Sequence, residues 1–355
     1  MKLPSGNKFK VIGAMSGTSC DGLDLAASKF WKENNIWKFT IEAAKTVEYT
    51  NNWLNKLQKA PFLPGEKLIE LHAEYGRFIG EKVNEFISET GFQPDFIASH
   101  GHTIFHQPVK QFTFQLGNGA QIAATTQITT ISDFRTGDVA LGGQGAPLVP
   151  IGDRLLFSEF DYCLNLGGFA NISFERENKR IAFDICPVNF VLNSLAEKQG
   201  FPFDKNGELG KKGKVNLELL DKLNNIDFYK TAAPKSLGRE WVETKFLPTL
   251  NSINISKADR FRTVYEHIAM QISRSIMPPG KILITGGGAF NIFLIERIQQ
   301  LTKAQIIIPE PYIVNFKEAL IFAFLGVLKM QGHVNCLASV TGASKDSSSG
   351  VIFPV

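Results

Sequence analysis

One stretch near the amino terminus constrains the fold more than any other part of the chain, because it combines two strands with a glycine-bearing loop. Residues 11–15 are apolar, as in a strand buried on both faces, and the polar residues 16–22 follow. Apolar side chains then return at every second position from Leu23 to Ala27, which is the period of a second strand. The sequence therefore predicts a β-hairpin whose connection contains Gly17, Thr18, Ser19, Cys20, Asp21 and Gly22.

This loop has the composition of a phosphate site. Glycines allow backbone N–H groups to approach an anion closely, and Thr18 and Ser19 add hydroxyl donors. Asp21 is a candidate ligand for Mg²⁺. The same residue types also favour an ordinary hairpin turn. The loop is neither a Walker loop nor a dinucleotide fingerprint, and a phosphate loop inside a hairpin is typical of actin, Hsp70 and the sugar and acetate kinases.

The opening pattern returns in the second half of the chain. Residues 162–166 are apolar, residues 167–171, which begin with Gly167 and Gly168, form a tight turn, and residues 172–175 and 180–186 continue as strands. Such a repeat suggests an ancient duplication of a whole unit. Helical periodicity covers residues 68–87, 189–199, 216–223, 259–276 and 316–330. Gly91 is expected to stop the first of these helices, and residues 281–285 are expected to form a buried strand. Alternating strands and helices predict an α/β protein with mixed sheets.

The length of 355 residues is sufficient for two domains. We place them at residues 1–140 and 141–355, and we allow the helix at 316–331 to return to the first. The net charge of +4 is spread along the chain, and its densest run, residues 211–214, fits a solvated loop better than a nucleic-acid surface. Four scattered cysteines, no signal peptide and no membrane-length apolar run lead us to expect a cytoplasmic protein without a membrane partner.

With these residues in view, the chain resembles the anhydro-N-acetylmuramic acid kinases over nearly its whole length. The resemblance rests on motifs in the family's order, at residues 15–24, 99–103, 133–138, 142–150, 165–173, 183–184, 234–240, 286–291, 318–319 and 341–343. It implies two actin-like (ribonuclease H-like) domains of mixed sheets with flanking helices around a central cleft for ATP and sugar. It also implies bacterial cell-wall recycling, ATP with Mg²⁺, an amino-sugar partner and, by analogy alone, a homodimer.

The implied reaction opens the 1,6-anhydro bond of 1,6-anhydro-N-acetylmuramic acid with water and phosphorylates O6. The resemblance makes Asp184 the catalytic base. The alternative, purely structural role of Asp184 is to cap the next helix. The expected ATP-binding residues are Gly17, Thr18, Ser19, Cys20, Asp21, Gly22, Leu23, Asp24, Gly167, Gly168, Asn171, Gly286, Gly287, Gly288 and Asn291, with Asp21 oriented toward Mg²⁺. The alternative for residues 286–288 is a simple turn before a helix.

The expected sugar-side residues are Thr103, Arg135, Asp138 and Glu318. The guanidinium of Arg135 suits the lactyl carboxylate of a muramic sugar or a phosphate oxygen. Its alternative is a structural ion pair with Asp138, and the alternative for Glu318 is an interaction with the helix dipole.

The chain departs from the family pattern near the expected chemistry. The family usually has Asp-Thr-Gly-Pro-Gly-Asn where this chain has Asp184-Ile-Cys-Pro-Val-Asn189, and Val188 would be strained if its φ had to be positive. His102 replaces a typical Gln, Phe169 a smaller residue and Tyr265 a Thr. Three alternatives stay open: a kinase for a different sugar, a non-catalytic nucleotide- or sugar-binding descendant, and a zinc hydrolase with His100, His102 and His106 as ligands.

Overall fold

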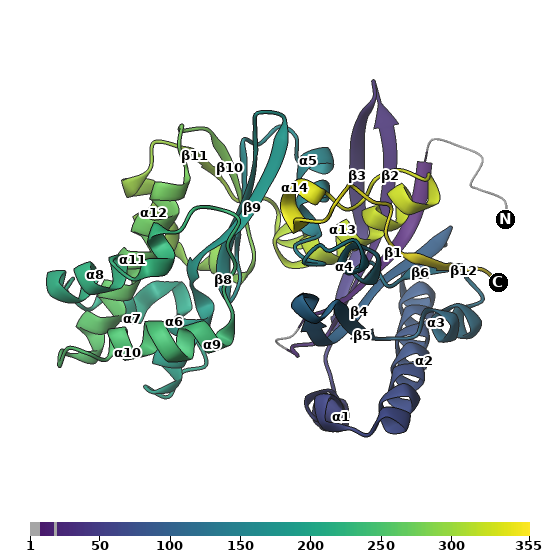
Figure 1. Cartoon of the computed structure of the whole chain (residues 1–355), viewed down its shortest axis with the longest axis horizontal. Coiled ribbons are helices and arrows are strands. Elements are labelled where there is room, and N and C mark those ends of the chain that lie inside the picture. Colours follow the sequence, from purple (N-terminus) through teal and green to yellow (C-terminus); the bar gives the residue numbers. More distant parts are fainter. Residues whose placement is uncertain (1–7, 18–19) are drawn as a thin grey trace. The chain divides into compact units, whose positions relative to one another are not determined.

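The structure is a computed structural model that describes residues 8–17 and 20–355 (Figure 1). The chain divides into two compact units, of which the first contains the residues up to Leu156 and again Phe316–Val355, and the second contains Phe157–Asn315. The sequence predicts a change of domain between residues 140 and 141, with all residues after 331 in the second domain. In the structure, the Gly- and Pro-rich stretch 141–150 and the carboxyl-terminal residues both belong to the first unit.

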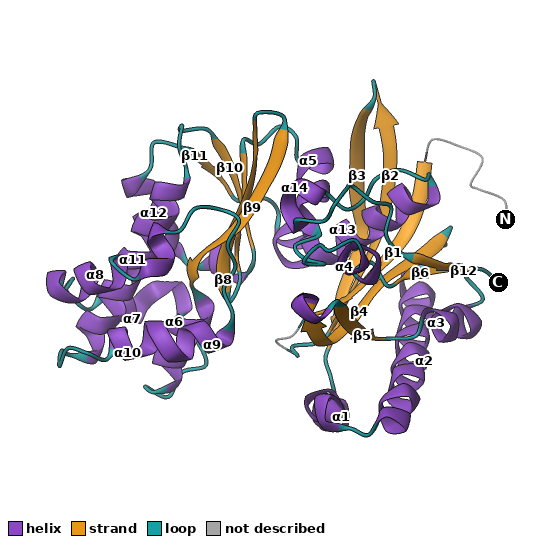
Figure 2. Ribbon diagram, viewed as in Figure 1, coloured by secondary structure: helices purple, strands orange, loops and turns teal. Residues whose placement is uncertain are grey.

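The first unit is built on a mixed sheet (Figure 2). Its strands are β1 (Lys8–Ser16), β2 (Leu23–Glu33), β3 (Ile36–Val47), β4 (Phe96–Gln107), β5 (Phe112–Leu116), β6 (Thr130–Ser132) and β12 (Val351–Phe353). Their order is β12-β6-β4-β1-β2-β3, and β5 pairs with β4 outside this row. β1 runs antiparallel to β2 and parallel to β4, which confirms the predicted hairpin.

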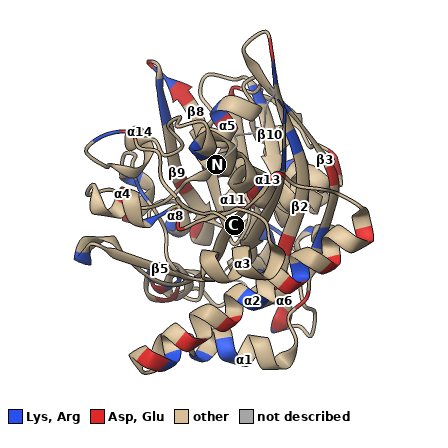
Figure 3. Ribbon diagram, turned by 90° about the vertical axis from the view of Figure 1, so that its right-hand side faces the viewer, with Lys and Arg blue, Asp and Glu red and all other residues tan. Residues whose placement is uncertain are grey.

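Helices α2 (Gly65–Thr90) and α3 (Gly119–Thr126) pack on apolar side chains of this sheet. Ile12 and Leu25 of the sheet share one core with Phe78 and Ile79 of α2. α2 ends at Gly91, whose left-handed φ of 68° closes the helix as the sequence predicted. Acidic and basic residues alternate along its outer side (Figure 3). The shorter helices of this unit are α1 (Asn51–Lys59), α4 (Thr136–Ala140), α5 (Val149–Leu156) and α14 (Ala338–Thr341).

Helix α13 (Pro311–Met330) approaches β1 more closely than a side chain would permit. A Cβ on Gly13 would lie 1.9 Å from the Ala319 carbonyl oxygen, so only glycine fits at this point. The neighbouring Lys317 makes a buried ion pair with Asp153 of α5, at 2.7 Å between Nζ and Oδ1. Glu318 therefore lies between two residues that are fixed to the body of the first unit.

The second unit repeats the strand order of the first. Its strands are β7 (Tyr162–Leu166), β8 (Phe169–Arg176), β9 (Lys179–Pro187), β10 (Lys281–Thr285) and β11 (Gln305–Ile307), in the order β11-β10-β7-β8-β9. In both units the first strand has an antiparallel hairpin partner on one side and parallel strands on the other. This arrangement is that of the actin-like (ribonuclease H-like) fold, and the shared order supports the predicted duplication.

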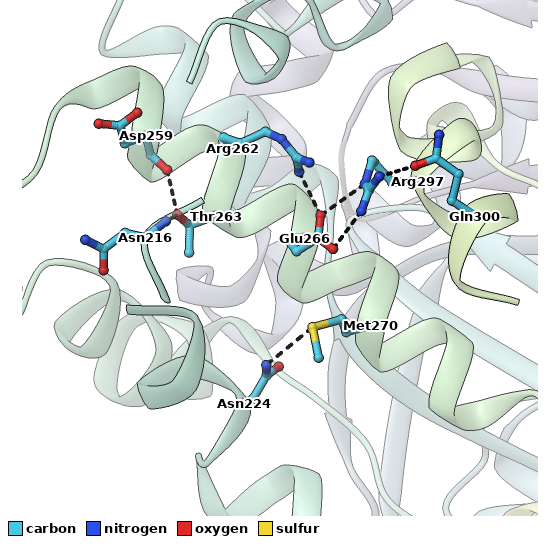
Figure 4. A network of polar contacts seen from close by, with 9 residues as sticks. All are labelled: Asn216, Asn224, Asp259, Arg262, Thr263, Glu266, Met270, Arg297 and Gln300. Atoms are coloured by element: carbon cyan, nitrogen blue, oxygen red, sulfur yellow. Dashed lines mark hydrogen bonds and ion pairs between the residues drawn. The ribbon is translucent and has the colours of Figure 1, made fainter. Parts of the chain in front are cut away.

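One apolar cluster holds the second unit together, with Leu164 and Ile282 from the sheet and Phe261 and Ile268 from α11. Its helices are α6 (Asn189–Glu197), α7 (Glu208–Lys211), α8 (Leu217–Asn224), α9 (Arg239–Trp241), α10 (Leu247–Leu250), α11 (Lys257–Ser275) and α12 (Ile292–Leu301). Figure 4 shows how α11 and α12 are joined: Glu266 accepts hydrogen bonds from Arg262 and Arg297, each at 2.8 Å.

Candidate active site

The loop between β1 and β2 turns back tightly. The Cys20 N–H donates to the Gly17 carbonyl oxygen at 3.2 Å, and Cys20 has a left-handed φ of 61°. Gly22 is required where the loop enters β2, because a Cβ there would lie 2.7 Å from the Val47 carbonyl oxygen. Thr18 and Ser19, the two expected hydroxyl donors, lie outside the described residues. The described part of the loop is compact, and its backbone depends on glycine.

Three acidic or apolar side chains at the end of the loop and the start of β2 have different surroundings. Leu23 is fully buried in the core, so only its backbone is available to a ligand, whereas Asp21 is exposed. Asp24 is half-buried, and its Oδ1 accepts a hydrogen bond of 2.6 Å from Thr46 Oγ1. Burial raises the pKa of Asp24, and the negative charge of Asp21 raises it further against the opposing effect of Thr46. A cation bound beside these two acids would relieve their repulsion.

Arg135 is held by two partners that the sequence did not indicate. Its Nε donates to His100 Nε2 at 2.9 Å, and one terminal nitrogen donates to the Gly145 carbonyl oxygen at 2.6 Å. His100 is buried against Phe322, with 4.5 Å between ring centroids, and burial together with the Arg135 charge lowers the pKa of His100 well below its usual range. The Nε2 of a neutral His100 accepts a hydrogen bond from the Arg135 Nε–H, and the second terminal nitrogen of the guanidinium lies outside both bonds.

Asp138 occupies a structural position. Its side chain is 1% exposed, and Oδ2 accepts the Gly145 N–H at 2.7 Å. Oδ1 accepts from Thr341 Oγ1 at 2.7 Å and from Cys336 Sγ at 3.0 Å. Across residues 8–17 and 20–355, the ion pairs include none between Asp138 and Arg135. Asp138 thus fixes the glycine-rich loop that supplies the carbonyl partner of Arg135.

Two of the expected sugar-side residues are accessible. Thr103 is half-buried on β4, and Glu318 is exposed on α13. Burial lowers the pKa of Arg135 to about 10, and the charge of Glu318 acts in the opposite direction. Arg135 therefore stays charged at neutral pH, with an acidic neighbour.

In the second unit, the Gly167–Gly168 turn rests on the first residues of α6. The N–H groups of Val188 and Phe190 donate to the Gly168 carbonyl oxygen at 2.8 and 3.2 Å, and the Asn189 N–H donates to the Gly167 carbonyl oxygen at 3.2 Å. These bonds satisfy helix N–H groups that have no partner within α6. The turn is shorter than predicted, because β8 already begins at Phe169.

Residues 286–288 lie against the strand that leads into this turn. A Cβ on Gly286 would lie 2.5 Å from Asn165 Oδ1, and a Cβ on Gly288 would lie 2.7 Å from Leu166 Cβ. Because β7 and β10 are parallel neighbours, their carboxyl ends meet at one edge of the sheet. The structure thereby brings the two predicted glycine turns of this unit together.

Asp184 lies near the end of β9, opposite Asn171 of β8. Its Oδ2 accepts a 2.8 Å hydrogen bond from the Leu237 N–H, and its own N–H donates to the Lys235 carbonyl oxygen at 3.0 Å. Burial raises the pKa of Asp184, and the Leu237 bond opposes this effect. The half-buried carboxylate is thus oriented at one oxygen and suited to accept a proton with the other. Leu237 was missed because a backbone donor leaves no trace in residue identity.

The residues that depart from the family pattern after Asp184 point into the core. Ile185, Cys186 and Val188 are each at most 2% exposed and belong to the apolar cluster of the second unit. Val188 has a φ of −125°, so the strain considered from the sequence does not arise. These three residues therefore differ from the family in the core of the second unit, and they do not contribute to the exposed surface around Asp184.

The two expected asparagines differ in availability. Asn171 is exposed beside Asp184. Asn291 caps α12, since its Oδ1 accepts the Leu294 N–H at 3.2 Å, and its Nδ2 donates to the Tyr265 hydroxyl at 2.7 Å. The side chain of Asn291 is therefore engaged within the unit, which leaves its backbone for a ligand.

The three histidines of the zinc hypothesis have other partners. His100 binds Arg135, His102 Nδ1 lies 2.8 Å from Ser16 Oγ, and His106 Nδ1 lies 3.1 Å from Thr113 Oγ1. Within the described part of the chain, no three His, Cys, Asp or Glu side chains are grouped as a metal site. The described helices also include none that is both long and apolar enough to cross a membrane.

Two units with one strand order, each with a glycine turn in its first hairpin, define a protein of the actin-like fold class. The chain belongs to the anhydro-N-acetylmuramic acid kinase family, because the model of the family described as "Anhydro-N-acetylmuramic acid kinase" matches residues 9–355.

Individual relatives agree with this assignment. The chain is 35% identical to the anhydro-N-acetylmuramic acid kinase of Vibrio cholerae, over 96% of this chain and 97% of the relative. It is 33% identical to that of Gloeobacter violaceus, over 97% of this chain and 98% of the relative. Among solved structures, a ROK family glucokinase from Streptomyces griseus in complex with glucose and AMPPNP aligns with a TM-score of 0.42 and 10% identity, over 89% of this chain and 98% of that chain.

Proposed function

We propose that the protein is an ATP-dependent kinase of 1,6-anhydro-N-acetylmuramic acid. It opens the anhydro bond with water and phosphorylates O6, which gives N-acetylmuramic acid 6-phosphate for the recycling of cell-wall sugars. Family membership over residues 9–355 supports the substrate. The observation that carries the chemistry is Asp184, a half-buried carboxylate of raised pKa that the Leu237 N–H holds at one oxygen.

In this proposal Asp184 is the general base. It takes a proton from the water that attacks the anomeric carbon, and the bond between that carbon and O6 breaks. The released O6 attacks the γ-phosphorus of ATP, the bond to the β-phosphate oxygen breaks, and ADP leaves. Asp184 then gives its proton to solvent, so the base is restored. Phosphoryl transfer needs positioning and charge neutralisation more than covalent help.

The glycine turns are the proposed phosphate contacts. The backbone of Gly17–Gly22 and the Gly167–Gly168 turn would bind the ATP phosphates, and residues 286–288 would lie along the adenosine. The acidic pair of Asp21 and Asp24 fits a divalent cation, because its two charges repel each other. When bound there, Mg²⁺ would neutralise charge on the phosphates.

On the sugar side, we assign the lactyl carboxylate to the terminal nitrogen of Arg135 that lies outside its bonds to His100 and Gly145. Thr103 and Glu318 are accessible and would bind sugar hydroxyl groups. Asp138 acts on Arg135 indirectly, because it holds the loop that contains Gly145. Dependence on ATP would place the protein in the bacterial cytoplasm.

The test is a product assay with the purified full-length protein, ATP, Mg²⁺ and the anhydro sugar. The expected result is ADP and a reducing sugar 6-phosphate in equal amounts, with no ADP released when the sugar is left out. N-acetylmuramic acid serves as the control acceptor, since it lacks the bond that must open. Turnover of another sugar alone would favour a kinase of different specificity, and binding of ATP without any turnover would favour a non-catalytic descendant.

A further inference from the structure

Four polar side chains form a buried chain of hydrogen bonds at the end of β1. Tyr75 lies in α2, Tyr49 follows β3, Ser16 ends β1, and His102 lies in β4. The Tyr49 hydroxyl contacts the Tyr75 hydroxyl and donates to Ser16 Oγ at 2.7 Å, and Ser16 Oγ lies 2.8 Å from His102 Nδ1. None of the four side chains is more than 8% exposed.

The hydroxyl protons give the tyrosine end of this chain its direction, and the tautomer of His102 gives the other end its direction. The only hydroxyl proton of Tyr49 is donated to Ser16, so the Tyr75 hydroxyl must donate to Tyr49. When Nε2 of the neutral His102 imidazole is protonated, Nδ1 is an acceptor, and Ser16 Oγ donates its proton to it at 2.8 Å. Burial lowers the pKa of His102 to about 4, which agrees with that neutral form. Every hydroxyl of the chain is therefore satisfied.

Such a network is costly to bury unless it is complete, and a complete one fixes its members rigidly. It connects β1 and β4 with α2 and the segment after β3, at the residue where the Gly17–Gly22 loop begins. Apolar side chains could fill the same core without having to be aligned for hydrogen bonds. Because Ser16 directly precedes Gly17, the network holds the residue next to the loop's first glycine.

We propose that Tyr75, Tyr49, Ser16 and His102 are positioning residues that fix the end of β1, and with it Gly17, for the phosphates of ATP. The inference rests on the proposed function, since it assumes that the Gly17–Gly22 loop binds ATP. It identifies a role for His102, which replaces the usual glutamine of the family but still offers a hydrogen-bond acceptor. It also identifies Tyr49 and Tyr75, which lie outside all the motifs of the resemblance.

The variant Tyr49→Phe removes the donor to Ser16 and keeps the aromatic ring, whose centroid lies 6.2 Å from that of Phe78. One lost hydrogen bond of this kind predicts a rise of about fivefold to tenfold in the KM for ATP, with an unchanged KM for the sugar. Tyr162→Phe is the matched control, because the Tyr162 hydroxyl donates to the Pro278 carbonyl oxygen at 2.8 Å in the second unit. It should lower stability and leave the KM for ATP unchanged.

A pair of substitutions at His102 completes the test. His102→Gln keeps an acceptor for Ser16 and should keep the wild-type KM for ATP, whereas His102→Leu removes the acceptor and should raise that KM by a similar factor. If Tyr49→Phe and His102→Leu lower the melting temperature but bind ATP like the wild type, the network is only structural and the inference is overturned. If the wild type itself neither binds ATP nor phosphorylates the anhydro sugar, the proposed function fails instead.

Discussion

The backbone N–H of Leu237 lies 2.8 Å from Oδ2 of Asp184 and donates a hydrogen bond to it. This bond joins two segments that are far apart in the sequence. A second bond joins the same segments, because the Asp184 N–H donates to the Lys235 carbonyl oxygen. One carboxylate oxygen is fixed by the backbone, and the direction of the other is fixed with it. An orientation that does not depend on a neighbouring side chain makes Asp184 a well-defined target for substitution.

Replacement of Asp184 by asparagine should abolish turnover, with a loss of at least about 100-fold, because the amide cannot accept the proton of the attacking water. Asparagine still offers an oxygen to the Leu237 N–H, so the fold and ATP binding should persist. The measurement is the steady-state rate of ADP formation beside ATP binding by calorimetry. Asp161→Asn is the control, because Asp161 is an exposed carboxylate that also accepts a backbone N–H, at 2.7 Å. Unchanged turnover in Asp184→Asn would exclude Asp184 as the base.

The pH dependence of kcat should reflect the same carboxylate. A base works only when deprotonated, so the rate falls as the pH is lowered through its pKa. Burial raises the pKa of Asp184, and the acid limb should therefore lie above the ordinary aspartate value of about 3.9. The profile is measured with saturating ATP and sugar, and enzyme returned to pH 7.5 after each acid exposure checks for unfolding. A rate that stays constant to pH 4 would contradict this assignment.

At Arg135, the fork geometry of the guanidinium predicts that lysine is no substitute. Lysine is a single flexible donor group, so it cannot hold His100 and Gly145 and also present a further nitrogen. Arg135→Lys should lower kcat/KM for the sugar by about 10-fold to 100-fold and leave the KM for ATP near the wild-type value. Arg77→Lys is the control on an exposed arginine of the same unit. Equal kinetics for Arg135→Lys and wild type would place the carboxylate elsewhere.

Much of this architecture could be predicted from side-chain patterns. The hairpin of β1 and β2, the bounds of β7 and β10 and the closing Gly91 of α2 follow from periodicity and turn chemistry, and the structure confirms them. The return of residues 332–355 to the first unit was missed, because β12 is a short strand whose pairing with β6 is decided by tertiary contact. The turn after β7 was predicted too long, since Phe169 and Asn171 already pair in the sheet.

Some residues of the candidate site could likewise be predicted from sequence, and their hydrogen-bond partners could not. Residue identity and family resemblance brought Asp184 and Arg135 forward, but their partners are a backbone N–H, a carbonyl oxygen and a buried histidine. Backbone groups carry no sequence signal. Asp138 shows the opposite case. It was brought forward by a family motif, but both of its oxygens accept hydrogen bonds from within the first unit.

The substituted loop after Asp184 offers a test of packing against chemistry. Val188 is fully buried with a negative φ, so the family's glycine would remove apolar contacts without relieving strain. Val188→Gly should lower the free energy of unfolding by about 2–4 kcal/mol, measured in urea, and should not raise kcat. Val109→Gly, at a position that is 93% exposed, is the matched control and should cost much less. A clear gain in kcat would show that Val188 hinders the sugar.

Buried neutral histidines should make stability depend on pH in a direction that follows from their pKa values. Burial lowers the pKa of His102 to about 4 and that of His267 to about 3, and it lowers the pKa of His100 well below the usual range. The unfolded chain, with histidine pKa values of about 6.5, binds more protons than the folded one below pH 7, so stability falls as the pH falls.

From pH 7.5 to 5.5, each such histidine should cost about 1.4 kcal/mol in the free energy of unfolding. His102→Gln keeps the acceptor for Ser16 but cannot titrate, so urea unfolding at the two pH values should show a loss smaller by about that amount. A substitution of the exposed His333 by glutamine is the control and should leave the difference between the two pH values as in the wild type. If His102→Gln and wild type lose the same stability, then His102 is protonated in the folded protein over this range, and the direction of the hydrogen bond from Ser16 would have to be reversed.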